Sequence, residues 1–270
     1  MGPAVGQSLR AWAMPSFAVS IATLSLLQAA LVALPRARRF AWLDAFRSPW
    51  WALVPALSIV VVIGVVALKG ESATVLSWLA LVAVPPFAAL ALGWLIHGAR
   101  PEWGAAVAPL FVIAWAAPGS LLGEAAATAL TALGCVGLGW LLVSVAPALW
   151  LKLGIYAMAA VDTWFVATNL LQGPNAVLTA AAPSGLPRLQ VVHLGDALMG
   201  FGDFFAAATL GSLLAASPRL QMRGAWLVAG LALAFDLLFF AVDTLPATVP
   251  VALGLALIEL WGRTAKRTAG

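Results

Sequence analysis

Charged residues are scarce in this chain. Asp, Glu, Lys and Arg together make up 9% of its 270 residues, whereas hydrophobic residues make up 63%. A soluble globular domain carries about 25% charged residues. This shortage argues against an ordinary soluble protein and indicates an integral membrane protein whose main surroundings are the lipid bilayer.

Cysteine and metal-binding motifs are also lacking. The one cysteine, Cys135, lies in an apolar segment, so no intramolecular disulfide can form. The two histidines, His97 and His193, have no companion ligands at metal-site spacing, and no His-Glu-x-x-His occurs. We therefore expect no metal and no other cofactor, and the sequence argues against a membrane metalloprotease.

Basic residues exceed acidic residues by 14 to 10, but they are scattered between apolar runs. No motif for binding RNA or DNA accompanies them. They are better interpreted as topology signals and as contacts to anionic lipid. The expected partners therefore include the bilayer but no nucleic acid.

Nine apolar stretches are interpreted as membrane helices, for which roughly 20 residues are typical and shorter lengths, as in the fourth, are tolerated. The first is followed by Arg36, Arg38 and Arg39, which favours a retained span over a cleaved signal peptide. The sequence thus predicts an all-α polytopic membrane protein, a bundle of about nine transmembrane helices. The predicted spans are 13–34, 50–68, 75–97, 103–117, 120–145, 148–171, 196–216, 224–243 and 245–261.

Nine spans place the two ends of the chain on opposite membrane faces, and the loop charges then orient it. Eleven Lys and Arg residues fall on one predicted face and three on the other. By the positive-inside rule, the amino terminus lies outside and the carboxy terminus is cytoplasmic, in a multi-pass protein of the plasma or inner membrane. The eleven are Arg36, Arg38, Arg39, Arg47, Arg100, Lys152, Arg219, Arg223, Arg263, Lys266 and Arg267, and the three are Arg10, Lys69 and Arg188.

Two aspartates, Asp162 and Asp203, lie within the sixth and seventh predicted spans. A carboxylate at membrane depth costs at least a few kcal/mol on insertion, so such residues usually belong to a proton, ion or catalytic site. The two spans run in opposite directions, and both aspartates lie roughly 10 to 14 Å from the same outer face at 1.5 Å per residue. They are the first candidates for a functional site.

Two carboxyls within a few Å of each other cannot both ionise in a low dielectric, so they share one proton. One can then act as a base that activates water while the other protonates a peptide carbonyl oxygen. The pair is therefore suited to aspartic proteolysis. Gly200 and Gly202, which lack side chains, would let the seventh helix approach the sixth closely.

Three segments resemble those of a known family. Residues 198–205 read Leu-Met-Gly-Phe-Gly-Asp-Phe-Phe and are similar to the seventh-helix signature of the presenilin and signal peptide peptidase family of intramembrane aspartyl proteases. Residues 162–169 resemble the sixth-helix segment of the signal peptide peptidase branch, and Pro246-Ala247-Thr248 resembles the family's Pro-Ala-Leu motif.

The resemblance implies a presenilin-like bundle in which residues 1–145 form the scaffold and substrate access and residues 146–270 the catalytic core. It implies that Asp162 and Asp203 are catalytic. The active-site motif would then be Gly200, Phe201 and Gly202, and substrate would be positioned by Pro246, Ala247 and Thr248.

This chain departs from the family at two positions. Val161 stands where the family usually has tyrosine, with Tyr156 as a possible polar support, and Thr248 stands where leucine is expected. The predicted cytoplasmic carboxy terminus resembles the signal peptide peptidase branch. The resemblance thus implies cleavage of transmembrane segments or remnant signal peptides.

Other interpretations stay open at this stage. Asp236 is expected at a similar depth, as a competitor for a catalytic role or as polar support. A prepilin-peptidase-like aspartyl protease also carries Gly-x-Gly-Asp, and a proton-coupled transporter would use buried aspartates. The stretch 172–195 suits a flexible gate or a partly inserted hairpin. The sequence does not predict the oligomeric state.

Overall fold

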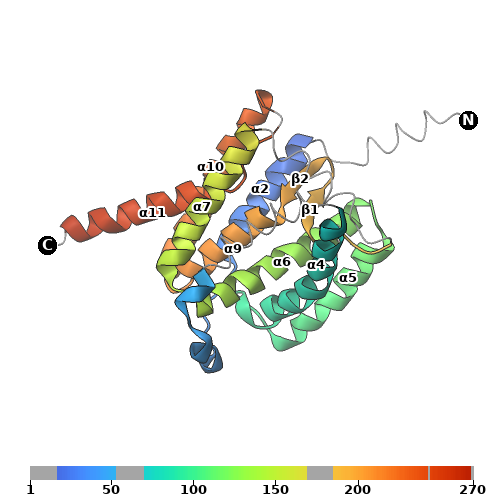
Figure 1. The fold of residues 1–270 in the computed structure, drawn as a ribbon, viewed down its shortest axis with the longest axis horizontal. Coiled ribbons are helices and arrows are strands. Elements are labelled where there is room, and N and C mark those ends of the chain that lie inside the picture. The colour runs from blue at the N-terminus through green and yellow to red at the C-terminus, as the bar shows by residue number, and fades with distance from the viewer. Residues whose placement is uncertain (1–16, 53–69, 169–184, 243, 269–270) are drawn as a thin grey trace, which may run out of the picture.

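The computed structural model describes residues 17–52, 70–168, 185–242 and 244–268, and this part of the chain is mostly helical (Figure 1). Most of the predicted second span, 50–68, lies outside the described residues. The α-helices are α2 (Phe17–Ala33), α4 (Gly70–Leu90), α5 (Val107–Ala116), α6 (Leu121–Val145), α7 (Ala148–Ala167), α9 (Phe201–Leu214), α10 (Pro218–Asp236) and α11 (Val249–Thr268). Short helical turns are η1 (Ala41–Phe46), η2 (Pro49–Ala52), η3 (Ala91–Leu95), η4 (Pro101–Ala106) and η5 (Leu237–Phe240), and the strands are β1 (Val191–Leu194) and β2 (Ala197–Gly200).

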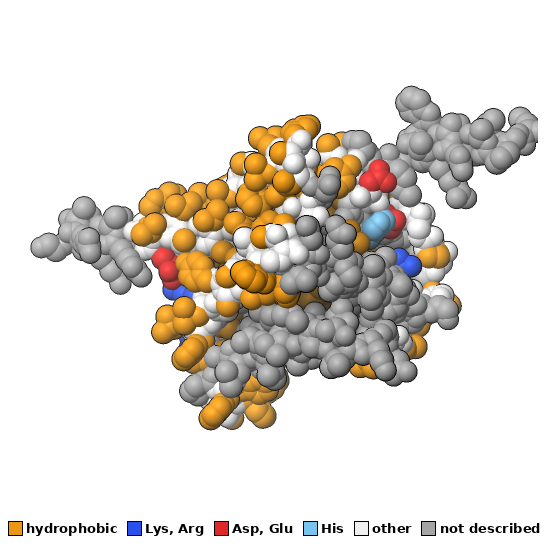
Figure 2. All heavy atoms as spheres, turned by 45° about the horizontal axis from the view of Figure 1, so that its top comes forward, with side chains coloured by type: hydrophobic (Ala, Val, Ile, Leu, Met, Phe, Trp, Pro, Cys, Tyr) orange, Lys and Arg blue, Asp and Glu red, His pale blue; other side chains and the backbone are white. Residues whose placement is uncertain are grey.

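Four helical segments are long and apolar enough to cross a membrane: Thr74–Leu95, Leu121–Val145, Ala148–Ala167 and Pro218–Phe240. Four shorter apolar helices accompany them among the described residues. Apolar side chains cover much of the described surface in Figure 2, and large ones such as Trp226 and Phe240 are strongly exposed. A surface of this kind is matched to lipid rather than to water, as expected of a membrane protein.

Helix α6 lies at the centre of the bundle and packs against α4, α5 and α9. Its glycines allow this close packing. A Cβ added at Gly137 would lie 2.5 Å from the Phe87 carbonyl oxygen, and one at Gly139 would lie 2.9 Å from the Thr209 backbone nitrogen. Helix backbones can approach this closely only where side chains are absent.

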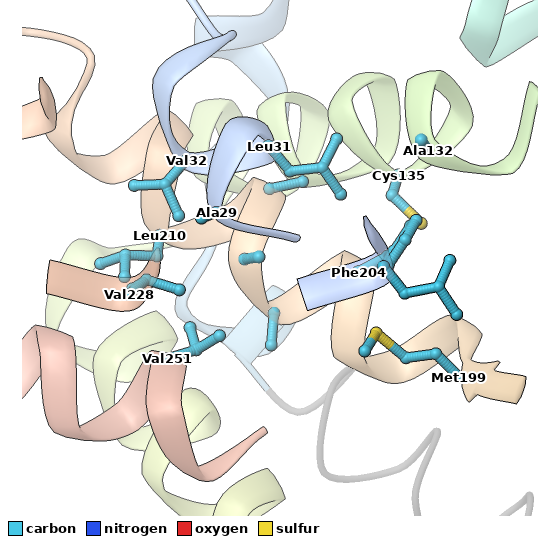
Figure 3. Close-up of a cluster of buried hydrophobic side chains, with 14 of the residues drawn as sticks. Ala29, Leu31, Val32, Ala132, Cys135, Met199, Phe204, Leu210, Val228 and Val251 are labelled. Atoms are coloured by element: carbon cyan, nitrogen blue, oxygen red, sulfur yellow. The ribbon is translucent and has the colours of Figure 1, made fainter. Parts of the chain in front are cut away.

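Helix α9 packs between α6 and α2 and contributes to the largest apolar cluster (Figure 3). Its Phe204 and Leu210 are fully buried. Gly211 permits contact with α2, because a Cβ there would lie 2.6 Å from the Val32 carbonyl oxygen. Figure 3 shows Val32, Leu210, Val228 and Val251 side by side, so α2, α9, α10 and α11 share one core.

A β-hairpin precedes α9, and this corrects the prediction of a continuous helix over 196–216. Strands β1 and β2 pair antiparallel, with Val191 opposite Gly200 and Leu194 opposite Ala197. Gly195 makes the turn at a φ of 58°, where glycine has no steric penalty. Gly200 is extended, so α9 begins only at Phe201. The stretch 172–195, for which a gate or a partly inserted hairpin was suggested, thus ends within a β-hairpin.

Other helix boundaries also differ from the prediction. Helix α11 begins at Val249 rather than at 245, so the Pro246-Ala247-Thr248 segment precedes it. The described part of the sixth predicted span ends at Ala167, and residues 169–171 lie outside the described chain. The fourth predicted span, 103–117, begins as the 3-10 turn η4 and is α-helical only from Val107. The proposed division at residue 145 remains a prediction.

Candidate active site

Asp162 and Asp203 line the same cavity, which has a volume of about 140 Å³. Both residues are half-buried, and a negative charge on Asp162 disfavours a second one on Asp203. A space of this size holds several water molecules. The cavity is further lined by parts of α2, β2, α10 and the segment before α11.

Asp203 occupies the first turn of α9, which differs from the mid-helix position predicted for it. Its Oδ2 accepts a hydrogen bond of 3.0 Å from the Gly200 backbone N–H. The unpaired N–H groups at a helix start favour a negative charge in this position. A Cβ at Gly200 would lie 3.1 Å from that same oxygen, so glycine leaves room for the carboxyl.

Asp162 lies near the end of α7 and is held by Thr248. The Thr248 hydroxyl donates to Asp162 Oδ2 at 2.8 Å, and the Thr248 backbone N–H donates to the same oxygen at 3.4 Å. Leucine, which the resemblance leads one to expect at this position, could not make the first bond. Threonine at this position therefore gives Asp162 a hydrogen bond that leucine could not give.

The rest of the Pro246-Ala247-Thr248 segment has separate contacts. Ala247 lines the cavity, whereas Pro246 does not. The Pro246 carbonyl accepts the Val249 N–H at 3.1 Å, and the Thr248 carbonyl accepts the Ala252 N–H at 3.1 Å. These bonds start α11 immediately after this segment.

Gly202 does not have the predicted role of bringing the sixth and seventh predicted helices together. A Cβ there would meet only the Met158 Cε of α7, at an ordinary 3.5 Å. The close approaches of α9 are made by Gly211 to α2 and by α6 Gly139 to the α9 backbone. Gly202 and Phe201 do not line the cavity. Phe201 instead stacks on Phe205, with ring centroids 6.5 Å apart.

The hydroxyl of Tyr156 bonds to another helix, and its role as polar support of the aspartate pair remains a prediction. Tyr156 is six residues before Asp162, about 240° around the helix at 100° per residue, so it faces another direction. Its hydroxyl donates to Glu259 Oε2 of α11 at 3.3 Å. Glu259 also pairs with Lys152 of α7 at 2.9 Å. Tyr156 thus belongs to a polar contact that joins α7 to α11.

Asp236 of α10 lines the same cavity as the other two aspartates. It hydrogen bonds with Ser25 of α2. Its Oδ2 is buried and has no hydrogen-bond partner among the described residues. The cavity therefore contains three carboxyls, from α7, α9 and α10.

Comparisons with models of known protein families, with curated proteins and with solved structures found no match. Within the described ranges, no three Cys, His, Asp or Glu residues are grouped so that they could hold a metal ion. Two carboxyls beside water-sized space can transfer protons to and from a bound group.

Two polar residues of the site were not predicted from the sequence. Gln28 of α2 is fully buried and donates to the Asp203 carbonyl at 3.3 Å and to the Ala247 carbonyl at 2.9 Å. Ser25 lies one helical turn before it and lines the cavity with it. A polar Gln and Ser three residues apart in the apolar run 17–33 were the available signal.

The hairpin that leads to Asp203 has its own anchor. Glu124, in the first turn of α6, accepts the Gly195 N–H at 2.8 Å and lies 3.0 Å from His193 Nδ1. Thr128 donates to the His193 carbonyl at 3.2 Å. These contacts attach the turn of the hairpin to the central helix, so the position of β2 relative to the cavity is fixed.

Proposed function

We propose that this chain is an intramembrane aspartyl endopeptidase that cleaves transmembrane segments or remnant signal peptides. The observation that carries the proposal is that Asp162 and Asp203, from two different helices, line one water-sized cavity. We also propose that the chain has a presenilin-like arrangement of about nine spans, with its carboxy terminus in the cytoplasm.

In the proposed reaction, one carboxyl of the pair is ionised and the other is protonated. The ionised carboxyl takes a proton from water as the water oxygen attacks the peptide carbonyl carbon, and the protonated carboxyl gives its proton to the carbonyl oxygen. The resulting gem-diol returns a proton while the amide nitrogen is protonated. The C–N bond then breaks to give a carboxyl and an amine.

The hydrogen bonds at the pair support this chemistry. Oδ2 of Asp162 is held by Thr248, and Oδ2 of Asp203 is held by Gly200. In the proposed reaction, the second oxygen of each carboxyl is the one that acts on water and substrate. Holding both groups in place before the substrate arrives lowers the cost of orienting them in the transition state.

Strand β2 offers a way to present a substrate. Leu198, Met199 and Gly200 of this strand line the cavity. Within the described ranges β2 pairs only with β1, so backbone groups on its other edge can receive an extended peptide. A transmembrane helix must unwind before its peptide bonds can be attacked, and pairing along β2 would satisfy the exposed amide groups beside Asp203.

The test is cleavage of a transmembrane peptide by the full chain reconstituted in liposomes. We expect the wild type to cleave, and Asp162→Asn and Asp203→Asn each to lower kcat by roughly a thousandfold, within the range of general acid–base catalysis. Cleavage sites are mapped by mass spectrometry. A prepilin leader peptide is included in the panel, since a prepilin-peptidase-like enzyme would use the same chemistry on that substrate.

Asp44→Asn is the matched control, because Asp44 is exposed on η1 and does not line the cavity. It should cleave as the wild type does. If either variant of the pair retains wild-type cleavage, the assignment of that aspartate is wrong.

A proton-coupled transporter is the second candidate, because Asp236 gives the cavity a third carboxyl. Buried carboxyls are common proton carriers in transporters. The same liposomes can be given a pH gradient and tested for uptake of solutes. Proton-dependent uptake that is lost in Asp162→Asn or Asp203→Asn, with no peptide cleavage by the wild type, would replace the protease proposal.

A further inference from the structure

Asp236 is a carboxyl at the cavity that the proposed cleavage chemistry does not use. It comes from α10, whereas the proposed catalytic pair comes from α7 and α9. Ser25 hydrogen bonds with it, yet Oδ2 is buried without a partner among the described residues. A buried acceptor that is left unpaired is unfavourable, so native structures usually supply a donor for it.

The described side chains around the cavity do not supply that donor. None of those that line it is Lys, Arg or His. Among its other polar side chains, the Gln28 amide serves two backbone carbonyls, whereas Thr244 lines the cavity without bonding Asp236 Oδ2. The Gly200 N–H serves Asp203. Asp236 is only half-buried, so a group that enters the cavity can also offer a donor to the exposed part of its carboxyl.

We propose that Asp236 binds a hydrogen-bond donor side chain of the substrate beside the bond that is cleaved. This inference rests on the proposed function and names the substrate class: transmembrane segments with Lys, Thr, Ser or Asn near the cleavage site. The donor must be a side chain if Asp236 is to select between substrates. Backbone N–H groups occur in every peptide, and in the proposal they pair with the edge of β2. Polar side chains are rare in membrane spans, so recognition of one is selective.

Lys should be the preferred residue. A hydrogen bond between an ammonium group and a carboxylate is stronger than one between neutral groups. The cavity also has carboxyls from three helices and no described basic residue to balance them. A neutral donor such as Thr should be preferred less strongly, and an apolar residue of the same shape least.

The experiment uses pairs of transmembrane peptides that differ only at one position, Lys against Met and Thr against Val. The position is moved one residue at a time across the mapped cleavage site. At one position we expect wild-type kcat/KM to be roughly tenfold higher for Lys than for Met, and a few-fold higher for Thr than for Val, as bonds to charged and neutral groups predict. In Asp236→Ala both ratios should fall to about one.

Asp236→Asn is the second variant, since it keeps the shape and one acceptor oxygen. It should lose most of the Lys preference and keep part of the Thr preference. Each result is a ratio measured on one enzyme sample, so it does not depend on the folded fraction. Asp44→Asn should retain both wild-type ratios.

The outcomes separate this inference from the proposed function. Equal cleavage within both peptide pairs by the wild type, or a preference that survives in Asp236→Ala, overturns the role of Asp236 while the protease stands. Loss of all cleavage in both Asp236 variants also overturns it, because the residue would then act in catalysis. No cleavage by the wild type, or full cleavage by Asp162→Asn, overturns the protease and this inference together.

Discussion

The two aspartates reach one cavity from regions with different surroundings. Asp203 lies in the first turn of α9, which is packed between α6 and α2 and has eight buried residues in its 14. Asp162 is on α7, whose apolar stretch is 17% buried, against 67% for that of α6. Only Leu151, Ile155 and Ala159 are buried on α7.

This difference divides the site into two parts. The fixed part is Asp203, whose position is set by the buried core, and the docked part is Asp162, whose position depends on how α7 packs at the edge of the bundle. The position of Asp203 follows from close backbone packing and from a bond within its own first turn. The position of Asp162 depends on how α7 rests against α9 and α11 and on the bond from Thr248. A change at the edge of the bundle can therefore alter the pair while the core stays intact.

The largest expected effect is on the fixed part. In Gly211→Leu the new side chain meets the α2 backbone, because even a Cβ would lie 2.6 Å from the Val32 carbonyl oxygen. We expect the free energy of unfolding to fall by about 3 kcal/mol or more, as for severe overpacking. Thermal unfolding in detergent measures the change.

Gly230→Leu is the control for this prediction. Gly230 lies in α10, and nothing lies within 4 Å of a Cβ added there. Its replacement should be neutral or slightly stabilising, because glycine is a poor helix residue. Equal destabilisation by both substitutions would contradict the close packing assigned to α9.

The second prediction concerns the docked part. Thr248→Val keeps the shape of the side chain but removes the 2.8 Å hydroxyl bond to Asp162. We expect kcat for peptide cleavage to fall roughly tenfold or more, as for loss of a hydrogen bond to a charged group, while KM changes little. Thermal unfolding should shift much less than in Gly211→Leu.

Two further variants test whether the hydroxyl bond itself causes the expected fall in kcat. Thr248→Ser keeps the hydroxyl and should retain most of the activity. Thr163→Val removes a hydroxyl from the residue next to Asp162, but that hydroxyl donates to the Ala159 carbonyl of its own helix at 2.7 Å. If Thr163→Val lowers kcat as much as Thr248→Val does, the bond to Asp162 is not what matters.

The helical part of the fold is largely predictable from the sequence, because long apolar runs such as 120–145 have few alternatives to a membrane helix. The start of α9 was predicted wrongly. Strand β2 precedes it, and its partner strand β1 ends at Leu194, with only two residues between the strands, so the pairing is local. The Gly195-Asp196 turn between the two strands is a hairpin signal in the sequence, and the prediction of a continuous helix did not use it.

The candidate site was predictable in its carboxyls but not in their partners. Asp162, Asp203 and Asp236 are conspicuous because charge is rare in apolar runs. Gln28 is 175 residues from Asp203, and Thr248 is 86 residues from Asp162. Contacts of that separation depend on how the helices pack, so residue type alone did not assign them.

The smallest expected effect concerns the polar contact between α7 and α11. Glu259 pairs with Lys152, and their side chains are 28% and 35% exposed, so solvent and lipid headgroups can replace the partner. We expect Glu259→Gln to change the free energy of unfolding by less than about 1 kcal/mol. A double-mutant cycle with Lys152→Met, measured by thermal unfolding and by kcat, isolates the pair.

A small coupling energy with unchanged kcat would mean that apolar packing and Thr248 hold α7 in place. A single bond at the cavity would then matter more to the position of Asp162 than an ion pair further along its helix. A fall in kcat as large as that of Thr248→Val would contradict this. Asp162 would then be positioned by the charged end of α7, and the docked part of the site would extend along the whole α7–α11 contact.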